Sequence, residues 1–259
     1  MPELLEIETY RQAALPVVGR TIATVHAPDD WYAKGATTPA LLREILPGCT
    51  ASAVRRVGKL MLLDTDGPVL GMRFGMTGRL VVDGGAPIEE LEYSSGRNDP
   101  AWDRFGLTFE GGGQLTIRDP RRLGGVELDP DESRLGPDAA SVTFAPFRDI
   151  VATSSSPLKA RLMDQAKLAG LGNLLVDETL WRAGLSPARP ARSLDDVEMR
   201  RLHRTMRRTV SLLGERGGSH TGDLQPARLR GGHCPKDGAV LNREAIGGRT
   251  TYWCPHHQH

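Results

Sequence analysis

The pattern of apolar and polar positions divides the chain into a strand-rich first half and a helical second half. In the first half, short apolar runs bounded by polar or turn residues predict strands at 21–25, 60–64, 69–74, 78–82, 107–110 and 115–118. Gly111-Gly112-Gly113 lies between the last two runs and predicts a hairpin turn. Residues 3–15 and 38–46 predict two helices. We therefore expect a sheet-rich lobe, a sandwich with a leading helix.

The texture changes after residue 130. Residues 130–146 contain Gly136-Pro137 and several small residues, which indicate a linker. Helices are then predicted at 157–165, 174–183 and 195–213, and a Gly-Leu-Gly-Asn turn at 170–173 separates the first two. Gly184 and Pro187 end the second of these helices. A Gly-rich segment with two cysteines closes the chain, so the fold class is α+β.

Composition excludes several classes of protein. With 259 residues, 39% of them hydrophobic and 25% charged, the chain has the composition of a globular protein. Three scattered cysteines cannot form a disulfide framework, which fits a reducing compartment. No apolar run is long enough to span a membrane. The start, MPELLEIETYR, is acidic where a signal peptide is basic. We expect a cytoplasmic, nucleoid-associated protein that acts as a monomer.

The net charge of +1 conceals an uneven distribution. Residues 1–154 have a balance of −6, whereas residues 155–259 have a balance of +7. The helix at 195–213 is strongly basic on one side, where it contains Arg200, Arg201, Arg204, Arg207 and Arg208. Such asymmetry indicates a basic lobe that faces a polyanion; the alternative is a solvated helix face.

The tail has the layout of a zinc site. Cys234 and Asp237 are followed, after sixteen residues, by Cys254 and His257. Zinc accepts Cys, His and carboxylate ligands, and a short Gly-rich tail has too little apolar area to fold alone. His233 or His256 could replace one of these ligands. The alternative is a metal-free finger held by packing of Tyr252 and Trp253.

The N-terminus offers a nucleophile. Removal of Met1 would leave Pro2 with a secondary amine that can attack a carbonyl or a sugar C1′ and form an iminium. Glu3 and Glu6 follow within one helical turn and could transfer protons. The alternative is an ordinary helix start.

Four further positions stand at the ends or turns of predicted elements. Lys59 precedes an apolar strand, where a lysine is usually a solvated edge residue. Met76 lies in the turn Gly-Met-Thr-Gly and is either presented by it or buried. Arg121 belongs to Asp-Pro-Arg-Arg-Leu-Gly, a turn suited to a phosphate clamp or an ion pair. Asn173 begins a helix as an N-cap or as a phosphate contact.

These motifs occur in a characteristic order. They are PELLEIET at 2–9, GK at 58–59, GMTG at 75–78, DPRRLG at 119–124, LMDQAKLAGLGNLLVDETLWRAGLSP at 162–187 and GGRTTYWC at 247–254. In this order the chain resembles, over nearly its whole length, the formamidopyrimidine-DNA glycosylase and endonuclease VIII family of base-excision repair enzymes.

The resemblance implies three segments: a catalytic β-sandwich with a leading helix at 1–130, a helix–two-turns–helix DNA-binding domain at 131–226 and a zinc-finger hairpin at 227–259. It implies a DNA glycosylase and abasic-site lyase that acts on double-stranded DNA containing a damaged base or an abasic site. One structural zinc ion would be held by Cys234, Asp237, Cys254 and His257.

The resemblance also implies a role for each site residue. Pro2 would be the nucleophile, Glu3 the general acid and base, and Glu6 its support. Lys59 would contact the phosphate beside the lesion and assist elimination. Asn173 and Arg249 would hold the flanking phosphates. Three side chains would fill the space left by the flipped nucleotide: Met76, Arg121 and Leu123.

Four departures modify these expectations. Leu5 and Ile7 replace the Pro and Val common in the family, without an expected effect. Leu123 stands where enzymes specific for 8-oxoguanine usually have Phe, and residues 214–231 are shorter than their lesion-covering loop. Both departures favour oxidised pyrimidines, ring-opened purines, abasic sites or unusual adducts. Two zinc positions are Asp and His rather than Cys, which leaves the metal and its ligands open.

Two other functions fit parts of the sequence. A non-catalytic binder of damaged or bent DNA would keep the fold but would not need Pro2, Glu3, Glu6 and Lys59. A zinc-finger protein that binds RNA or the ribosome would account only for the basic charge and the finger. The glycosylase accounts for all of these features.

Overall fold

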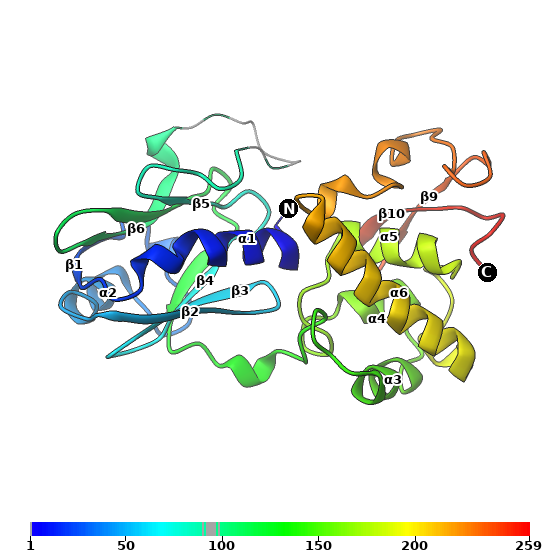
Figure 1. Ribbon diagram of the computed structural model, residues 1–259, viewed down its shortest axis with the longest axis horizontal. Coiled ribbons are helices and arrows are strands. Elements are labelled where there is room, and N and C mark those ends of the chain that lie inside the picture. The colour runs from blue at the N-terminus through cyan, green and yellow to red at the C-terminus, as the bar shows by residue number, and fades with distance from the viewer. Residues whose placement is uncertain (1, 90, 92–96, 98) are drawn as a thin grey trace. The chain divides into compact units, whose positions relative to one another are not determined.

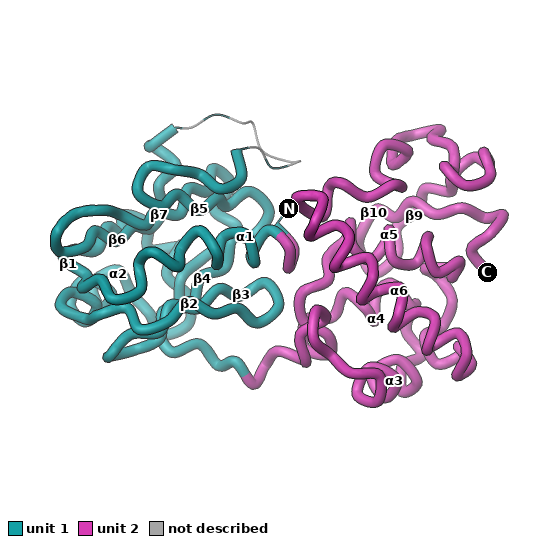
Figure 2. The backbone as a smooth tube through the Cα atoms, viewed as in Figure 1, with its two compact units in different colours: residues 1–2, 6–132 teal, residues 3–5, 133–259 magenta. Residues whose placement is uncertain are grey.

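The change of pattern near residue 130 coincides with a boundary between two structural units. The computed structural model describes residues 2–89, 91, 97 and 99–259. Unit 1 contains residues 1–2 and 6–132, and unit 2 contains residues 3–5 and 133–259 (Figures 1 and 2). The prediction of three segments, with the hairpin tail separate from the helices, stays a prediction.

Within its described residues, unit 1 has two antiparallel four-stranded sheets. One has the strand order β1-β6-β7-β5 and the other β2-β3-β4-β8 (Figure 1). The first sheet consists of β1 (Ile22–His26), β5 (Arg79–Val82), β6 (Asp103–Phe109) and β7 (Gln114–Arg118). The second consists of β2 (Ala51–Val57), β3 (Leu60–Thr65), β4 (Leu70–Arg73) and β8 (Gly125–Leu128).

One hydrophobic core joins the two sheets. Phe105 and Ile117 of the first sheet share it with Met61 and Met72 of the second, and all four side chains are fully buried. The helices α1 (Leu4–Ala14) and α2 (Pro39–Ile45) add Tyr10 and other apolar side chains. This arrangement confirms the predicted sandwich with a leading helix.

Strands β2 and β8 were not among the predicted elements. Both are edge strands of their sheet. The sequence of β2, ASAVRRV, combines small residues with two adjacent arginines and is only partly buried, and β8 begins with a glycine. Edge strands can be polar, and neither of these two offers the apolar run by which the other edge strands, β1 and β5, were predicted.

Unit 2 contains four helices and a hairpin among its described residues. These are α3 (Phe144–Ala152), α4 (Leu158–Met163), α5 (Asn173–Ala183), α6 (Asp196–Glu215), β9 (Asn242–Ile246) and β10 (Arg249–Trp253). The helices surround a second core, which includes Leu4 and Leu5. Gly184 ends α5 in the left-handed conformation, with a φ of 67°, as the sequence predicted. Asp195 and Glu198 form a capping box at the start of α6.

The predicted linker at 130–146 is wrong in its second part, because α3 begins at Phe144. Thr143 is the N-cap residue, which makes Pro146 the third residue of the helix. Proline is tolerated in the first turn because the N–H groups there have no partner within the helix. Pro146, at which the predicted linker ended, therefore lies in the first turn of a helix.

None of the helices formed by the described residues is long and apolar enough to cross a membrane.

Candidate functional site

The carboxylate of Glu3 caps the start of a helix in unit 2. It is fully buried and accepts hydrogen bonds from the backbone N–H groups of Gly172 (2.8 Å), Leu174 (2.8 Å) and Leu175 (3.1 Å). These groups lie at the start of α5, whose N-cap residue Gly172 supplies no side-chain cap. Glu3 thus caps α5 from a distant part of the chain. The N–H groups and the helix dipole stabilise its negative charge.

The close approach of Glu3 requires a glycine at position 172. A Cβ atom there would lie 2.3 Å from the carboxyl carbon of Glu3 and 2.4 Å from its Oε1. Gln165 fixes the same loop, because its amide donates to the carbonyl of Leu171 (2.9 Å) and its side-chain oxygen accepts from the N–H of Gly170 (3.0 Å). The segment 162–175 is therefore a preformed pocket for one carboxylate.

Asn173 connects the start of α5 to the terminal hairpin. Its Nδ2 donates to the carbonyl of Thr250 in β10 (3.2 Å), while its Oδ1 is buried without a hydrogen-bond partner. Thr250 follows the exposed Arg249. Asn173 is thus tied to the strand that presents Arg249.

The hairpin turn places Arg249 at its tip. Gly247 and Gly248 join β9 to β10 with φ values of 59° and 73°, as a two-residue turn of this kind requires. Ile246 pairs with Arg249 directly after the turn. A Cβ at Gly247 would lie 2.9 Å from Cβ of Ala160, so the tip packs against α4.

A buried group of charges holds the hairpin against the helices. Nζ of Lys159 lies 2.7 Å from Oδ1 of Asp177 and 2.8 Å from Oγ1 of Thr251, and all three side chains are fully or almost fully buried. Arg228 forms a second ion pair with Asp177. Burial lowers the pKa of Lys159, and the charge of Asp177 opposes that shift. These residues were not singled out from the sequence, because their spacing reveals no common site.

Pro2, Glu6 and Lys59 belong to unit 1. Pro2 is buried and precedes α1, and Glu6 lies in the first turn of that helix, 4% exposed. One turn later, Tyr10 donates from its hydroxyl to the carbonyl of Gly78 (3.2 Å). Lys59 is half-buried in the two-residue turn between β2 and β3, where Gly58 has a φ of 57°.

Asp119 joins the two loops that contain Met76 and Leu123. It is fully buried, and its carboxylate accepts from Oγ1 of Thr77 (2.6 Å) and from the backbone N–H groups of Gly124 (2.8 Å) and Arg121 (3.2 Å). A Cβ at Gly75 would lie 2.4 Å from the carbonyl carbon of Leu123. The turn 75–78 and the loop 119–124 therefore form one structure, which is named the paired loops below.

The two neighbouring arginines of the second loop differ. Arg122 has a φ of 55°, which is unusual for a residue with a side chain, and its guanidinium forms two 2.6 Å hydrogen bonds to the carboxylate of Asp29. Arg121 and Leu123 are exposed, Leu123 to 49%, and Met76 is half-buried. The ion pair anticipated for this motif thus belongs to Arg122, which leaves Arg121 on the surface of the paired loops.

Asp119, Gly172 and Gln165 are positioning residues that sequence reasoning missed as such. All three lie inside the quoted motifs. Asp119 has a local signal, because Asp accepting the N–H two residues later is a common turn. No local signal exists for Gly172, whose neighbour Glu3 is 169 residues away.

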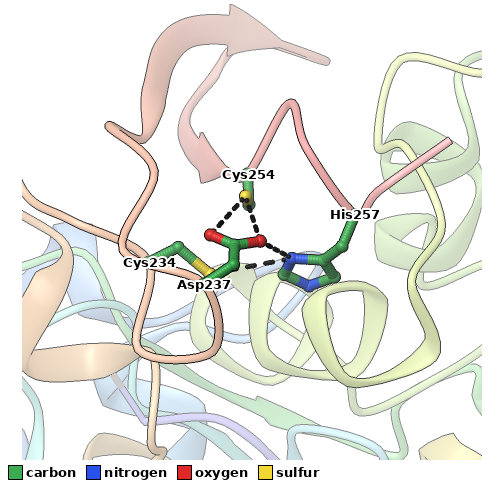
Figure 3. A group of neighbouring side chains, drawn as sticks. All are labelled: Cys234, Asp237, Cys254 and His257. Carbon is green, nitrogen blue, oxygen red and sulfur yellow. Dashed lines mark hydrogen bonds and ion pairs between the residues drawn. The ribbon is translucent and has the colours of Figure 1, made fainter.

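The terminal segment brings four metal-ligating side chains together. Ligand atoms of Cys234, Asp237, Cys254 and His257 all lie within 4.8 Å of one another (Figure 3). His233 and His256, the alternatives considered from the sequence, are exposed and lie outside this cluster. The cluster could hold a metal ion.

The surroundings of the cluster suit a cation. Nδ1 of His257 faces Oδ2 of Asp237 at 2.9 Å, whereas Nε2 lies 3.1 Å from the carbonyl of Trp181. A proton on Nε2 would leave the lone pair of Nδ1 for a metal, the usual arrangement for a ligating histidine. Hydrogen bonds from the backbone N–H of Ala239 and from the side chain of His257 lower the pKa of Asp237. Burial raises the pKa of Cys254 to about 11, and a bound cation would reverse this shift.

Comparison with known proteins places these features in one family. The family model described as the formamidopyrimidine-DNA glycosylase N-terminal domain matches residues 1–126, and that of the formamidopyrimidine-DNA glycosylase H2TH domain matches residues 135–223. Formamidopyrimidine-DNA glycosylase of Thermus thermophilus is 37% identical over 98% of this chain and 97% of its own length. That of Geobacillus kaustophilus is 32% identical over 98% of both chains.

A solved structure agrees over the full length. The crystal structure of Lactococcus lactis Fpg in complex with DNA containing an abasic site has a TM-score of 0.82 and 25% identity, covering 100% of both chains.

Proposed function

Because the chain belongs to the formamidopyrimidine-DNA glycosylase family, we propose that it is a DNA glycosylase of base-excision repair that also cleaves the strand as an abasic-site lyase. The observation that carries this proposal is the fixed position of Glu3. Three backbone N–H groups hold its carboxylate directly beside Pro2 in the chain. A binding protein would not need a buried carboxylate next to an N-terminal proline.

The proposed reaction begins at Pro2. After removal of Met1, the lone pair of the secondary amine attacks C1′ of the damaged nucleotide, and the bond from C1′ to the base breaks; the base leaves with the proton that the amine nitrogen loses. Glu3 serves as the acid and base that assists opening of the deoxyribose, and Glu6 supports it. The nitrogen of Pro2 becomes a cationic iminium, which acidifies the proton on C2′.

Strand cleavage follows from this iminium. Loss of the C2′ proton breaks the bond from C3′ to the 3′ phosphate oxygen, which leaves as the phosphate of the downstream strand. A second elimination can break the bond from C5′ to its phosphate. Addition of water to the iminium carbon then releases the sugar remnant as an aldehyde and returns Pro2 to its amine form. Lys59, in the turn between β2 and β3, contacts the phosphate beside the lesion and assists elimination.

Access to C1′ requires that the nucleotide leave the duplex. Unstacking costs about a few kcal/mol, which inserted side chains and phosphate contacts offset. Met76, Arg121 and Leu123, on the paired loops, fill the vacated space. Asn173 and Arg249 hold the flanking phosphates through the start of α5 and the hairpin tip. Two observations support this assignment: Leu123 is exposed, and the carboxylate of Asp119 is hydrogen-bonded to both loops.

The substrate proposed is duplex DNA with an oxidised pyrimidine, a ring-opened purine or an abasic site. Leu123 offers a smaller apolar contact to the opposite base than Phe would. The segment after α6 is short, and Glu178 fixes it by accepting from the N–H groups of Asp223 (3.0 Å) and Leu224 (2.9 Å). A fixed, short segment favours breadth over close coverage of one purine lesion.

One zinc ion is proposed for the terminal cluster, with Cys234, Asp237, Cys254 and His257 as ligands. Two sulfurs, one carboxylate oxygen and one imidazole nitrogen suit a tetrahedral zinc. The role of the ion is structural, since it would fix the segments that flank β9 and β10 and thereby present Arg249. Metal analysis of the purified protein should find about one zinc per chain, and Cys254→Ser should lower that content.

A panel of lesion-bearing duplexes tests the function, with base release and strand cleavage measured separately. We expect release of ring-opened purines and oxidised pyrimidines, and cleavage of abasic DNA without added nuclease. Tight binding of lesion DNA with neither release nor cleavage would instead indicate the non-catalytic binder. Preference for RNA over abasic duplex in competition would indicate the RNA-binding alternative.

A further inference from the structure

Helix α6 has an arginine-rich face that no proposed step of the reaction uses. Residues 200–208 read RRLHRTMRR and contain five basic but no acidic residues. At 3.6 residues per turn, the five arginines fall within roughly a third of the helix circumference and extend over about 12 Å. The structure exposes all five of them: Arg200, Arg201, Arg204, Arg207 and Arg208. We name this surface the arginine face.

The opposite side of α6 is the buried one. Met199, Leu202, Met206 and Val210 enter the second core together with Leu175 and Leu180 of α5. The arginine face therefore lies on the side of α6 opposite to the residues that pack with α5. Since Asn173 begins α5, the arginine face and Asn173 lie on different sides of the helix pair and cannot hold the same phosphate.

The positive charge of this face is almost uncompensated. Within the described part of the chain, the one acidic side chain at ion-pairing distance is that of Glu198, 4.0 Å from Arg201. Glu198 already forms two 2.6 Å hydrogen bonds to Arg189. Arg200 lies over the ring of Phe144, and Arg207 donates to the carbonyl of Val142, contacts that leave both charges unneutralised.

A solvated helix face normally mixes both signs of charge, because like charges three or four residues apart repel one another. Arg204 has a like-charged neighbour at each such distance, namely Arg200, Arg201, Arg207 and Arg208. Binding of a polyanion would relieve the repulsion among these arginines. Each planar guanidinium can bind a phosphate through two N–H donors.

We propose that the arginine face is a second DNA-binding surface, which contacts the phosphate backbone of undamaged duplex outside the lesion. It rests on the proposed function only for the identity of the polyanion as DNA. The phosphates can belong to the flank of the same duplex or to a second segment of DNA. Its function would be to keep the protein on DNA between lesions, since such contacts are independent of sequence.

The test is the double variant Arg204→Gln/Arg208→Gln, because glutamine keeps helix propensity and removes two charges. The matched control is Arg148→Gln/Arg216→Gln, which removes two exposed arginines of the same unit, each paired with an aspartate. Helix content by circular dichroism should be the same for both variants and the unsubstituted protein. Binding is measured with labelled undamaged duplex of about 40 base pairs over a range of salt concentrations.

We expect the Arg204/Arg208 variant to bind this duplex about 10-fold more weakly at low salt, with a salt slope smaller by about 1–2. The control should keep the slope. Excision from a lesion duplex of about 15 base pairs should be unchanged, because the short DNA is held at the lesion. If the unsubstituted protein binds a long lesion duplex more tightly than a short one and the variant does not, the face contacts the flank of the same duplex. If the variant instead loses the ability to bind two duplexes at once, the face contacts a second segment of DNA.

Equal affinity and slope for variant and control would overturn the proposal. An equally large loss of excision on the short duplex would also overturn it, because the face would then bind DNA at the lesion itself. A variant that loses affinity for RNA but not for duplex DNA would overturn it as well. Binding to undamaged duplex does not require catalysis. A protein that releases no base would therefore refute the proposed function but leave this result readable.

Discussion

Glu3 and Asp119 are both fully buried carboxylates that accept backbone N–H groups, but they organise different parts of the molecule. Glu3 receives three N–H groups from one helix start, 169 or more residues away in the chain. Asp119 receives two N–H groups from its own loop and two hydroxyls, from Thr77 and Tyr32. One carboxylate is held by a remote helix; the other holds two loops.

The difference separates a catalytic residue from a positioning residue. In the proposed reaction Glu3 acts on the nucleotide itself. The role of α5 is therefore to orient the carboxylate of Glu3 and to stabilise its negative charge. Asp119 would touch no DNA, and its effect would pass through Met76, Arg121 and Leu123. Substitution of Glu3 should therefore affect the chemical step, and substitution of Asp119 should affect the opening of the duplex.

The largest effect is expected for Glu3→Gln. The amide keeps one acceptor oxygen, but it loses the charge and turns N–H groups toward the N–H groups of α5. Base excision should fall by about 10²–10⁴-fold, and the free energy of unfolding should fall by about 1–3 kcal/mol. Single-turnover excision and thermal unfolding measure the two. Glu8→Gln, at a partly exposed position of the same helix where the carboxylate pairs with Arg11 and Arg56, should change excision by less than about 2-fold.

A nearly equal effect is expected for Gly172→Ala, which keeps the Glu3 carboxylate but displaces it. The added Cβ would lie 2.3 Å from the carboxyl carbon of Glu3. Displacement by about 1 Å should slow excision by about 10²-fold. Gly214→Ala is the control, because its Cβ would lie 3.4 Å from Leu5, an ordinary contact. Full activity in Gly172→Ala would show that the position of Glu3 is not limiting.

A smaller effect is expected for Asp119→Asn. The amide keeps one acceptor oxygen for the donors on one side but turns its NH₂ group toward the donors on the other, so the paired loops should separate. Excision should fall by about 10-fold, and fluorescence of 2-aminopurine placed opposite the lesion should report less opening of the duplex. Asp29→Asn, which removes the charge that pairs with Arg122 but contacts neither paired loop otherwise, should have the weaker effect. A slowed chemical step with normal opening would contradict a positioning role.

The sequence predicted much of this arrangement and missed the rest for physical reasons. Apolar runs and turn glycines located six strands of unit 1, namely β1, β3, β4, β5, β6 and β7, and the helices α1, α2, α4, α5 and α6. The polar edge strands β2 and β8 and the start of α3 at Phe144 gave signals that the pattern does not resolve. The four cluster residues were predicted from their pairwise spacing, and the structure places them together.

Contacts between remote residues were beyond prediction from local pattern. Nothing in the spacing of Glu3 and Gly172 indicates that one fits only because the other lacks a side chain. Likewise, Arg121 and Arg122 are adjacent residues of the same type, and the sequence does not indicate which of them forms an ion pair. The structure shows that Arg122 bonds to Asp29. Residue types and order identified the family; the individual roles depend on the fold.

Borohydride trapping tests the central proposal most directly, namely that the amine of Pro2 attacks C1′. The protein, with removal of Met1 verified by mass spectrometry, is incubated with abasic duplex and borohydride, and the adduct is digested and sequenced. The proposal predicts a covalent protein–DNA adduct at Pro2 that disappears in Pro2→Gly variants with a blocked N-terminus. Absence of an adduct, or an adduct mapped to Lys59, would contradict it.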